Sequence, residues 1–137
     1  MVDVGLVDAG PLVALLNRGD SHHEACRLAA QKLQRPLLTI WPAFTEAMYL
    51  LGTSHLAQDA LWQQVESEAL LIMPLEQKDC VRMRFLMRKY RDQPMDLADA
   101  GLICLAERER IGRIFTLNRK HFSIYRAKGI GRLDVIP

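Results

Sequence analysis

Short apolar runs that alternate with helical patterns constrain this chain more than any other feature. Between these runs lie segments whose apolar residues recur at helical spacing. Five runs are candidate strands, the last of them at an edge: VGLV at 4–7, LLTI at 37–40, ALLIMPL at 69–75, RIFTL at 113–117 and RLDVIP at 132–137. Nearly continuous apolar strands separated by helices indicate a parallel sheet covered by helices on both faces. We therefore expect an α/β fold.

The size and composition of the chain fit one ordinary globular domain. With 137 residues, the chain is expected to form a single domain over residues 1–137. No apolar run approaches the ~18 residues of a membrane span, so no membrane association is expected. Cys26, Cys80 and Cys104 lie far apart, without metal or redox spacing. We expect all three to be small core residues in a reducing compartment, with the cytoplasm as the default location.

One expected helix carries two specific predictions. The segment HHEACRLAAQKLQ at 22–34 has apolar residues at helical spacing, and Pro36 is expected to end it. Asp20 or Ser21 is the expected N-cap. The residues predicted to form its apolar face are Ala25, Leu28, Ala29 and Leu33.

Charge is distributed unevenly along the chain, although the formal net charge is only +2. From Lys78 onward there are 14 Lys plus Arg against 7 Asp plus Glu, whereas residues 1–77 hold 4 against 9. Part of the basic excess lies on one expected helix, around the apolar Val81, Phe85 and Leu86; it comprises Arg82, Arg84, Arg88, Lys89 and Arg91. Such asymmetry favours a polyanionic partner, while a solvated helix face is the simpler alternative.

Polar side chains follow the expected strands at the points where the strands end. Asp8 comes directly after the first strand, Glu46 lies in the first turns of the helix after the second, and Asn118 follows the fourth. Asp96 and Asp99 open the helix before the fourth strand, and residues three apart on a helix share a face. Ligands bind outside the carboxyl ends of strands in open parallel sheets. We therefore expect these five side chains to converge.

Converging carboxylates repel one another unless protons or cations intervene. Hard divalent cations prefer oxygen ligands, and Mg²⁺ takes one or two carboxylates together with waters and phosphate oxygens. Such ions can activate a water and stabilise the leaving oxygen in phosphodiester cleavage. Each acid has a simpler explanation when taken alone: Asp8 or Asp96 could cap a helix, and Glu46 could lie on the surface. Their joint placement favours a metal site.

The residues quoted so far resemble those of a known family. VDAGPLVALLNRGDSHH at 7–23, the acid at Glu46, MDLADAGLICLAER at 95–108 and IFTLNRKHFSIYR at 114–126 resemble the PIN domain, in particular the VapC-type toxins of bacterial toxin–antitoxin pairs. The resemblance covers nearly the whole chain. It implies a three-layer α/β/α sandwich with a parallel sheet of about five strands. It also implies Mg²⁺- or Mn²⁺-dependent endoribonuclease activity on an RNA substrate, homodimerisation, and inhibition by a cognate antitoxin protein.

The resemblance carries over residue by residue. Asp8 matches the first metal ligand, Glu46 the second acid and Asp99 the third, with Asp96 an accompanying acid. Together they form the expected catalytic set. Asn118 stands where many members of the family have a fourth aspartate, which puts a second metal ion in doubt.

Two other functions remain open. Asn118 is compatible with a catalytically silent PIN-like module that binds RNA or protein. An unrelated doubly wound protein could use Asp8 as a phospho-acceptor, although the expected lysine near the sheet edge is missing from Thr116–Asn118.

Several residues are not expected to act in the site. His22 and His23 are expected to be exposed or capping, because adjacent helical side chains diverge by ~100°. The apolar side chains Trp41, Met48, Tyr49, Leu50 and Trp62 are expected in the core or a dimer interface. His121 could approach RNA phosphate, and Thr45 and Thr116 could support the ligands by hydrogen bonding.

Overall fold

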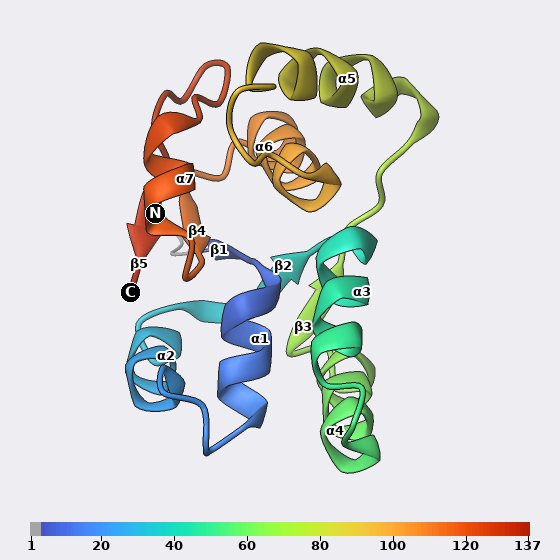
Figure 1. Cartoon of the computed structure of the whole chain (residues 1–137), viewed down its shortest axis with the longest axis vertical. Coiled ribbons are helices and arrows are strands. Elements are labelled where there is room, and N and C mark those ends of the chain that lie inside the picture. Colours follow the sequence, from blue (N-terminus) through green and yellow to red (C-terminus); the bar gives the residue numbers. More distant parts are fainter. Residues whose placement is uncertain (1–3) are drawn as a thin grey trace.

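A five-stranded parallel sheet organises the chain. The structure is a computed structural model that describes residues 4–137. The strands lie in the order β3-β2-β1-β4-β5, and every pair of neighbours is parallel (Figure 1). Their bounds are β1 Val4–Val7, β2 Gln34–Thr39, β3 Leu70–Ile72, β4 Arg113–Phe115 and β5 Asp134–Ile136. The predicted parallel sheet of about five strands is confirmed, with the last strand at an edge.

Helices cover both faces of the sheet, which gives the predicted three layers. Figure 1 shows α5 and α6 on one side of the sheet and α1, α2 and α4 on the other. The bounds are α1 Ala9–Leu16, α2 His23–Ala30, α3 Trp41–Leu50, α4 His55–Glu66, the short helix η1 Gln77–Asp79, α5 Cys80–Lys89, α6 Leu97–Glu109 and α7 Arg119–Ile124.

Alternate residues of the central strands feed two separate cores. In β1, Leu6 packs into the core beneath α5 and α6, whereas Val7 packs into the core beneath α1, α2 and α4. In β4, Ile114 and Phe115 divide in the same way. Side chains alternate along a strand, so a sheet buried on both faces needs continuous apolar strands. The unbroken apolar runs of the sequence follow from this requirement.

The helix α6 is buried over most of its length and holds the candidate acids close to the sheet. Nine consecutive residues from Ala98 to Ala106 are buried. Gly101 lies so close to Ile40 that a Cβ atom added there would be 2.5 Å from the Ile40 side chain. A larger residue at 101 would therefore force either the Ile40 side chain or α6 to shift.

The region around α2 differs from the prediction. The helix ends at Ala30, and Pro36 lies inside β2 instead of ending a helix. Pro36 is tolerated near the start of the strand, where its missing N–H costs little. Of the predicted apolar face, Ala29 and Leu33 are buried as expected, but Ala25 and Leu28 are exposed; Cys26 is buried as well.

The other differences concern local features. The N-cap of α2 is His22, whose backbone N–H donates to Asp20 Oδ1 at 2.8 Å. Cys26 and Cys104 are buried as predicted, but Cys80 is exposed at the start of α5. Across residues 4–137, no helix combines the length and hydropathy needed to cross a lipid bilayer.

Candidate metal centre

The carboxylate of Asp8 is held firmly at the end of the central strand. Its backbone N–H donates to Phe115 O at 3.0 Å, which continues the pairing of β1 with β4. The side chain caps α1, with Oδ1 accepting from Ala9 N at 2.8 Å, and Oδ2 accepts from Thr116 Oγ1 at 3.1 Å. Asp8 is only 3% exposed. The predicted supporting role of Thr116 is therefore seen in the structure, whereas Thr45 is exposed on α3.

Asp96 and Asp99 lie at the start of α6, as expected. Asp96 is the N-cap, and its Oδ1 accepts from Asp99 N at 2.9 Å. Asp99 is 4% exposed, and its Oδ2 accepts from the hydroxyl of Tyr125 at 2.9 Å. Asp96 therefore caps the helix and also lies beside Asp99, so the cap does not exclude a place in the metal site.

Glu46 and Asn118 lie at the more open side of the group. Glu46 is on α3, which follows β2, and the residue as a whole is exposed. Asn118 precedes α7, and its backbone N–H donates to Thr116 Oγ1 at 3.0 Å. The side chain of Asn118 also forms a hydrogen bond that lowers the pKa of Asp8. Asn118 thus faces Asp8, although its amide brings no negative charge.

The electrostatics show that the acids lie within range of one another. Burial raises the pKa of Asp8, and the negative charge of Asp96 raises it further. Burial, followed by the charge of Asp96, raises the pKa of Asp99 to about 7. Partial burial and the charges of Asp8 and Asp96 raise the pKa of Glu46. The structure therefore brings all four predicted acids together into one mutually repelling cluster.

Within residues 4–137, no ion pair includes any of these four acids. The donors to Asp8, Asp96 and Asp99 found in the described part of the chain are hydroxyl, backbone and amide groups, all of them uncharged. Buried carboxylates without a cationic partner are costly in their charged form. A bound cation would supply the missing countercharge.

The donor atoms suit a hard cation such as Mg²⁺, but not a cage made entirely of protein ligands. In the described part of the chain, no three acidic, histidine or cysteine side chains are arranged to hold a metal ion directly. Mg²⁺ usually binds through one or two carboxylates and keeps several waters. A carboxylate also has about four lone-pair sites, so the hydrogen bonds to Asp8 and Asp99 leave acceptor capacity. The residues therefore fit Mg²⁺ held partly through water.

Tyr125 is the supporting residue that the sequence did not reveal. It is fully buried, and burial and the charge of Asp99 raise the pKa of its hydroxyl. The hydroxyl therefore stays protonated and donates to Asp99. Its ring packs edge-on against Tyr90 and Phe122. Only the general expectation that a buried tyrosine finds a polar partner could have pointed to it.

The other predicted residues lie away from the cluster or on the surface. His22 is exposed, and His23 Nδ1 lies 2.7 Å from Ala14 O, so neither joins the acids. Five apolar residues were predicted to lie in the core or in a dimer interface. Met48 is half-buried. The other four are exposed, which excludes the core for them: Trp41, Tyr49, Leu50 and Trp62.

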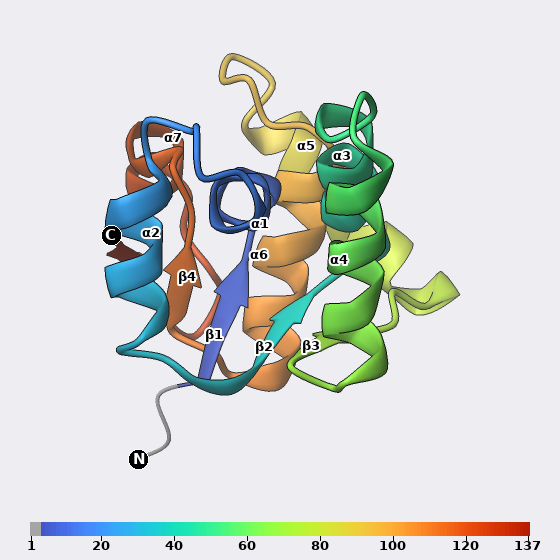
Figure 2. The same cartoon turned by 90° about the horizontal axis from the view of Figure 1, so that it is seen from below.

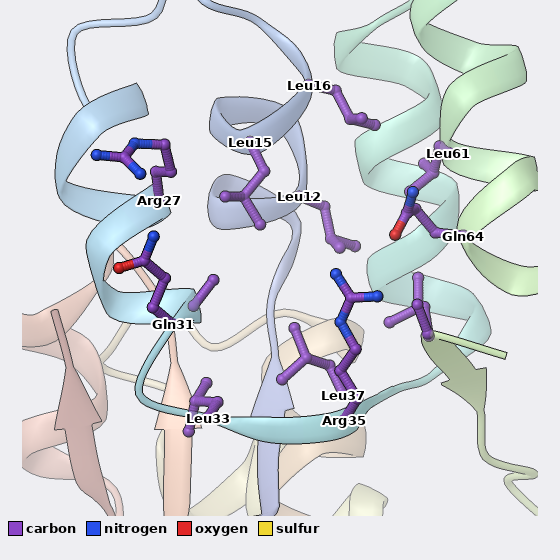
Figure 3. A pocket seen from close by; sticks show the side chains of 13 residues that line it. Leu12, Leu15, Leu16, Arg27, Gln31, Leu33, Arg35, Leu37, Leu61 and Gln64 are labelled. Carbon is purple, nitrogen blue, oxygen red and sulfur yellow. The ribbon is translucent and has the colours of Figure 1, made fainter. Parts of the chain in front are cut away.

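An apolar cavity of about 490 Å³ lies elsewhere, between α1, α2, α4 and the beginning of β2. Figure 3 shows leucines from these elements forming its walls, with Arg27, Gln31, Arg35 and Gln64 among them. None of the five predicted site residues lines it. The cavity and the acidic cluster are therefore separate features of the molecule.

A five-stranded parallel sheet between helical layers, with acids gathered at the carboxyl ends of its strands, defines a PIN-like α/β/α domain. No family model matches the chain. The chain is 28% identical over 134 residues to Ribonuclease VapC26 of Mycobacterium tuberculosis, covering 96% of this chain and 99% of the relative.

Two solved structures have a similar fold. One is VapC20 of Mycobacterium tuberculosis, described as a sarcin-ricin loop cleaving toxin, with a TM-score of 0.80, 16% identity, and coverage of 96% of this chain and 98% of that one. The other is a toxin–antitoxin complex from Klebsiella pneumoniae, with a TM-score of 0.71, 20% identity, and coverage of 97% and 96%. The predicted resemblance to VapC-type toxins of the PIN-domain family is thereby confirmed.

Proposed function

We propose that this chain is a Mg²⁺- or Mn²⁺-dependent endoribonuclease and the toxin of a type II toxin–antitoxin pair. The observation that carries the proposal is the cluster of Asp8, Glu46, Asp96 and Asp99, which lies where such folds bind ligands and forms no ion pair with any residue from 4 to 137. The name of the 28% identical relative, a ribonuclease, supports the same reaction.

The acids of the cluster would have different roles in the reaction, according to how deeply each is buried. Asp8 and Asp99 are the most deeply buried and most firmly held, so they would bind the cation with little rearrangement. A bound Mg²⁺ lowers the pKa of water and stabilises developing negative charge on phosphate oxygens. Glu46, on the open side, would accept a hydrogen bond from the attacking water and orient it. Asp96 would contact the cation directly or through water.

A second copy of the chain is the partner that the surface of α3 and α4 favours. The exposed apolar side chains of these two helices are Trp41, Tyr49, Leu50, Leu56 and Trp62. Trp41 and Trp62 are 6.4 Å apart between ring centroids, so the two helices present aromatic side chains together. Exposed aromatic residues are typical of protein–protein interfaces. We expect Tyr49→Lys to shift the protein towards monomer in size-exclusion chromatography with light scattering.

A cognate antitoxin is the second protein partner of the proposal. The Klebsiella pneumoniae neighbour is a toxin–antitoxin complex, which supports an inhibitor of this kind for the present chain. The proposed site of action is the cytoplasm, where RNA and antitoxin would both be available.

The decisive experiment is cleavage of total RNA by the purified protein. Cleavage is expected with Mg²⁺ or Mn²⁺, and none with EDTA or with Asp8→Asn in the presence of metal. Equal cleavage by a nuclease-free Asp8→Asn preparation would refute the assignment of the acidic cluster.

A catalytically silent module is the second candidate function. The amide at Asn118 and the lack, among residues 4–137, of three side chains placed to hold a metal ion directly both favour it. Such a module would bind RNA or protein without any metal-dependent cleavage. RNA binding that proceeds without strand breaks in both metals would establish it.

A further inference from the structure

The surface of α5 carries basic and apolar side chains that the acidic cluster does not use. Two adjoining hollows lie along this helix. The first is lined by Cys80, Val81, Arg84, Phe85, Arg88, Lys89 and Arg91. The second is lined by Cys80, Met83, Arg84, Met87, Arg88, Arg91 and Leu97. Cys80, Arg84, Arg88 and Arg91 belong to both lists, so three arginines form a row between the hollows. We call this surface the α5 groove.

The arginines of the α5 groove differ from the other arginines of the same layer. Arg82 pairs with Glu107 at 2.7 Å, and Arg108 pairs with Asp79 at 2.5 Å. In contrast, no acidic side chain within residues 4–137 forms an ion pair with Arg84, Arg88 or Arg91. Residues 80–91 contain five basic residues and no acidic one. The groove therefore attracts a polyanion, whereas the paired arginines stabilise the fold.

Exposed apolar side chains accompany these charges. Phe85 is 52% exposed and Val81 78%, although both lie on a helix whose other face is buried. The guanidinium of Arg82 lies over one face of the Phe85 ring, 5.0 Å from the ring centroid. A basic groove with an accessible aromatic ring is the usual construction of a surface that binds single-stranded nucleic acid.

The α5 groove leads towards the acidic cluster. The second hollow ends at Leu97, which directly follows Asp96 and begins α6. Figure 2 shows the arrowheads of β1 and β4 at the same end of the molecule as the segment that joins α5 to α6. Arg91 belongs to that segment. A strand lying along α5 would therefore reach the carboxyl ends of the sheet strands.

We propose that the α5 groove binds a single strand of RNA and guides it to the acidic cluster, with phosphates on Arg84, Arg88 and Arg91 and one base on Phe85. The substrate class rests on the proposed function; the binding surface does not. Arg84 and Arg88 are one helical turn apart, about 6 Å along the axis. This spacing presents them as successive contacts along an extended backbone.

RNA fits this surface better than a protein partner does. A protein interface typically has few charges at its centre, and unpaired arginines buried there would be costly. A flexible anion with accessible base faces satisfies both the arginines and the phenylalanine. An acidic protein segment remains the competing occupant, and the experiments below separate the two.

Binding without cleavage tests the charges. A labelled single-stranded RNA of about 12 nucleotides is titrated with the protein in EDTA, and anisotropy is followed from 50 to 300 mM salt. The double substitution Arg84→Gln/Arg88→Gln should raise Kd roughly tenfold near 0.15 M salt and reduce the salt slope by about 1.4. The matched control is Arg18→Gln/Lys32→Gln, which removes two exposed charges near α1 and α2 and should leave Kd unchanged.

A substitution series at Phe85 tests the base contact. Loss of one base–aromatic stack should weaken binding between about 5- and 100-fold, so Phe85→Ala is expected in this range. Phe85→Leu keeps the apolar volume and should lose nearly as much, whereas Leu28→Ala, which removes an exposed apolar side chain on α2 outside the groove, should bind as the wild type does. Equal affinity of Phe85→Leu and the wild type for RNA would overturn the stacking contact.

The outcomes distinguish this proposal from the proposed function. If the wild type cleaves RNA with Mg²⁺ but the double arginine variant binds RNA normally, the groove proposal is wrong and the nuclease assignment stands. If no cleavage occurs but the variants lose RNA binding as expected, the groove stands and the nuclease fails. Groove variants that lose affinity for a purified cognate antitoxin while retaining full RNA binding would assign the surface to protein and overturn the proposal.

Discussion

Two regions of the molecule bury acidic side chains in opposite ways. Where η1 and α5 lie beside α6, each acid forms an ion pair with an arginine. Asp79 pairs with Arg108, and Glu107 pairs with Arg82. At the carboxyl ends of the strands, the donors that Asp8 and Asp99 have among residues 4–137 are uncharged. Asp79 is nearly as buried as Asp8 and Asp99, at 7% exposed against 3% and 4%, so burial alone does not explain the difference.

The pKa shifts follow this difference in partners. Burial alone would raise the pKa of Glu107, but the hydrogen bonds from Arg82 and from the Lys128 backbone hold it below its usual value. Burial and neighbouring negative charge raise the pKa of both Asp8 and Asp99. The paired acids contribute to stability as they are, whereas the unpaired acids cost stability until a proton or cation joins them. Buried acids without a cationic partner therefore favour a site that binds a cation.

The largest expected effect is loss of activity on removing an unpaired acid. Asp8→Asn and Asp99→Asn should each reduce RNA cleavage by at least about a hundredfold, since even residues that only support a metal ligand are worth ~10–100-fold. The fold should persist, because the amide oxygen of asparagine can accept from Ala9 N–H at position 8 and from the Tyr125 hydroxyl at position 99, while the hydroxyl of Thr116 can accept from the new amide NH₂. Circular dichroism and a cleavage assay check both statements. Asp59→Asn, an exposed acid on α4, should retain full activity.

The next effect is a dependence of stability on pH that arises from Asp99. Its pKa is raised from 3.8 to about 7, so the folded protein binds a proton that the unfolded chain releases. Asp99 therefore makes the metal-free protein less stable as the pH rises from about 4 to about 7, by at most roughly 4 kcal/mol over that whole range and roughly 3 kcal/mol of it above pH 5. Thermal unfolding in EDTA between pH 5 and 8 measures this.

The same experiment has a matched variant. Asp99→Asn should flatten the pH profile and raise the melting temperature at pH 8, because the unfavourable charge is gone. A wild-type profile that rises between pH 5 and 8, or an Asp99→Asn variant with an unchanged slope, would contradict the view of Asp99 as an uncompensated acid.

Neutralising a paired acid should change the free energy of unfolding in the opposite direction from neutralising Asp99. Asp79→Asn leaves the guanidinium of Arg108 without its buried countercharge and should lower the free energy of unfolding by on the order of 3 kcal/mol. Denaturant unfolding at pH 8 measures it beside Asp99→Asn, which should stabilise. Glu109→Gln removes the other, more exposed partner of Arg108 and should cost less than about 1 kcal/mol. If Asp79→Asn stabilised the protein, the contrast between the two regions would fail.

Much of the fold could be predicted because apolar strands and helical spacing are local signals. The predictions that failed concern α2, of which only a narrow face is buried, and the start of β2. Leu28 is exposed and Cys26 is buried, and Pro36 lies where the pairing of β1 with β2 is irregular, between Gln34 and Leu38, a place where proline is tolerated in a strand. Such details depend on the space left by neighbours, which the pattern of one segment does not contain.

The candidate site could be anticipated from topology more than from its contacts. The rule that ligands bind outside the carboxyl ends of parallel strands was enough to predict that Asp8, Glu46 and Asp99 lie close together. The hydroxyl of Tyr125 was missed because it comes from 26 residues further along the chain than Asp99. The absence of arginine partners at the cluster was also invisible, since the sequence does not show which of the many basic residues turn towards it.

The smallest expected effect concerns Asn118, whose amide replaces a charge at the open side of the cluster. Asn118→Asp adds a fourth negative charge near Asp8 and removes the amide hydrogen bond that lowers the pKa of Asp8. The metal-free protein should therefore become slightly less stable, while Mg²⁺ affinity should rise by about two- to tenfold, since the cation gains one carboxylate ligand. Isothermal titration should find about one strong site per protomer in the wild type, with the gain of the variant clearest at low Mg²⁺. Asn118→Ala is the control, which removes the amide without adding charge and should not bind Mg²⁺ more tightly than the wild type. If the wild type already binds two Mg²⁺ tightly, or if Asn118→Asp leaves the affinity unchanged, Asn118 lies outside the metal site and the unpaired cluster consists of the four acids alone.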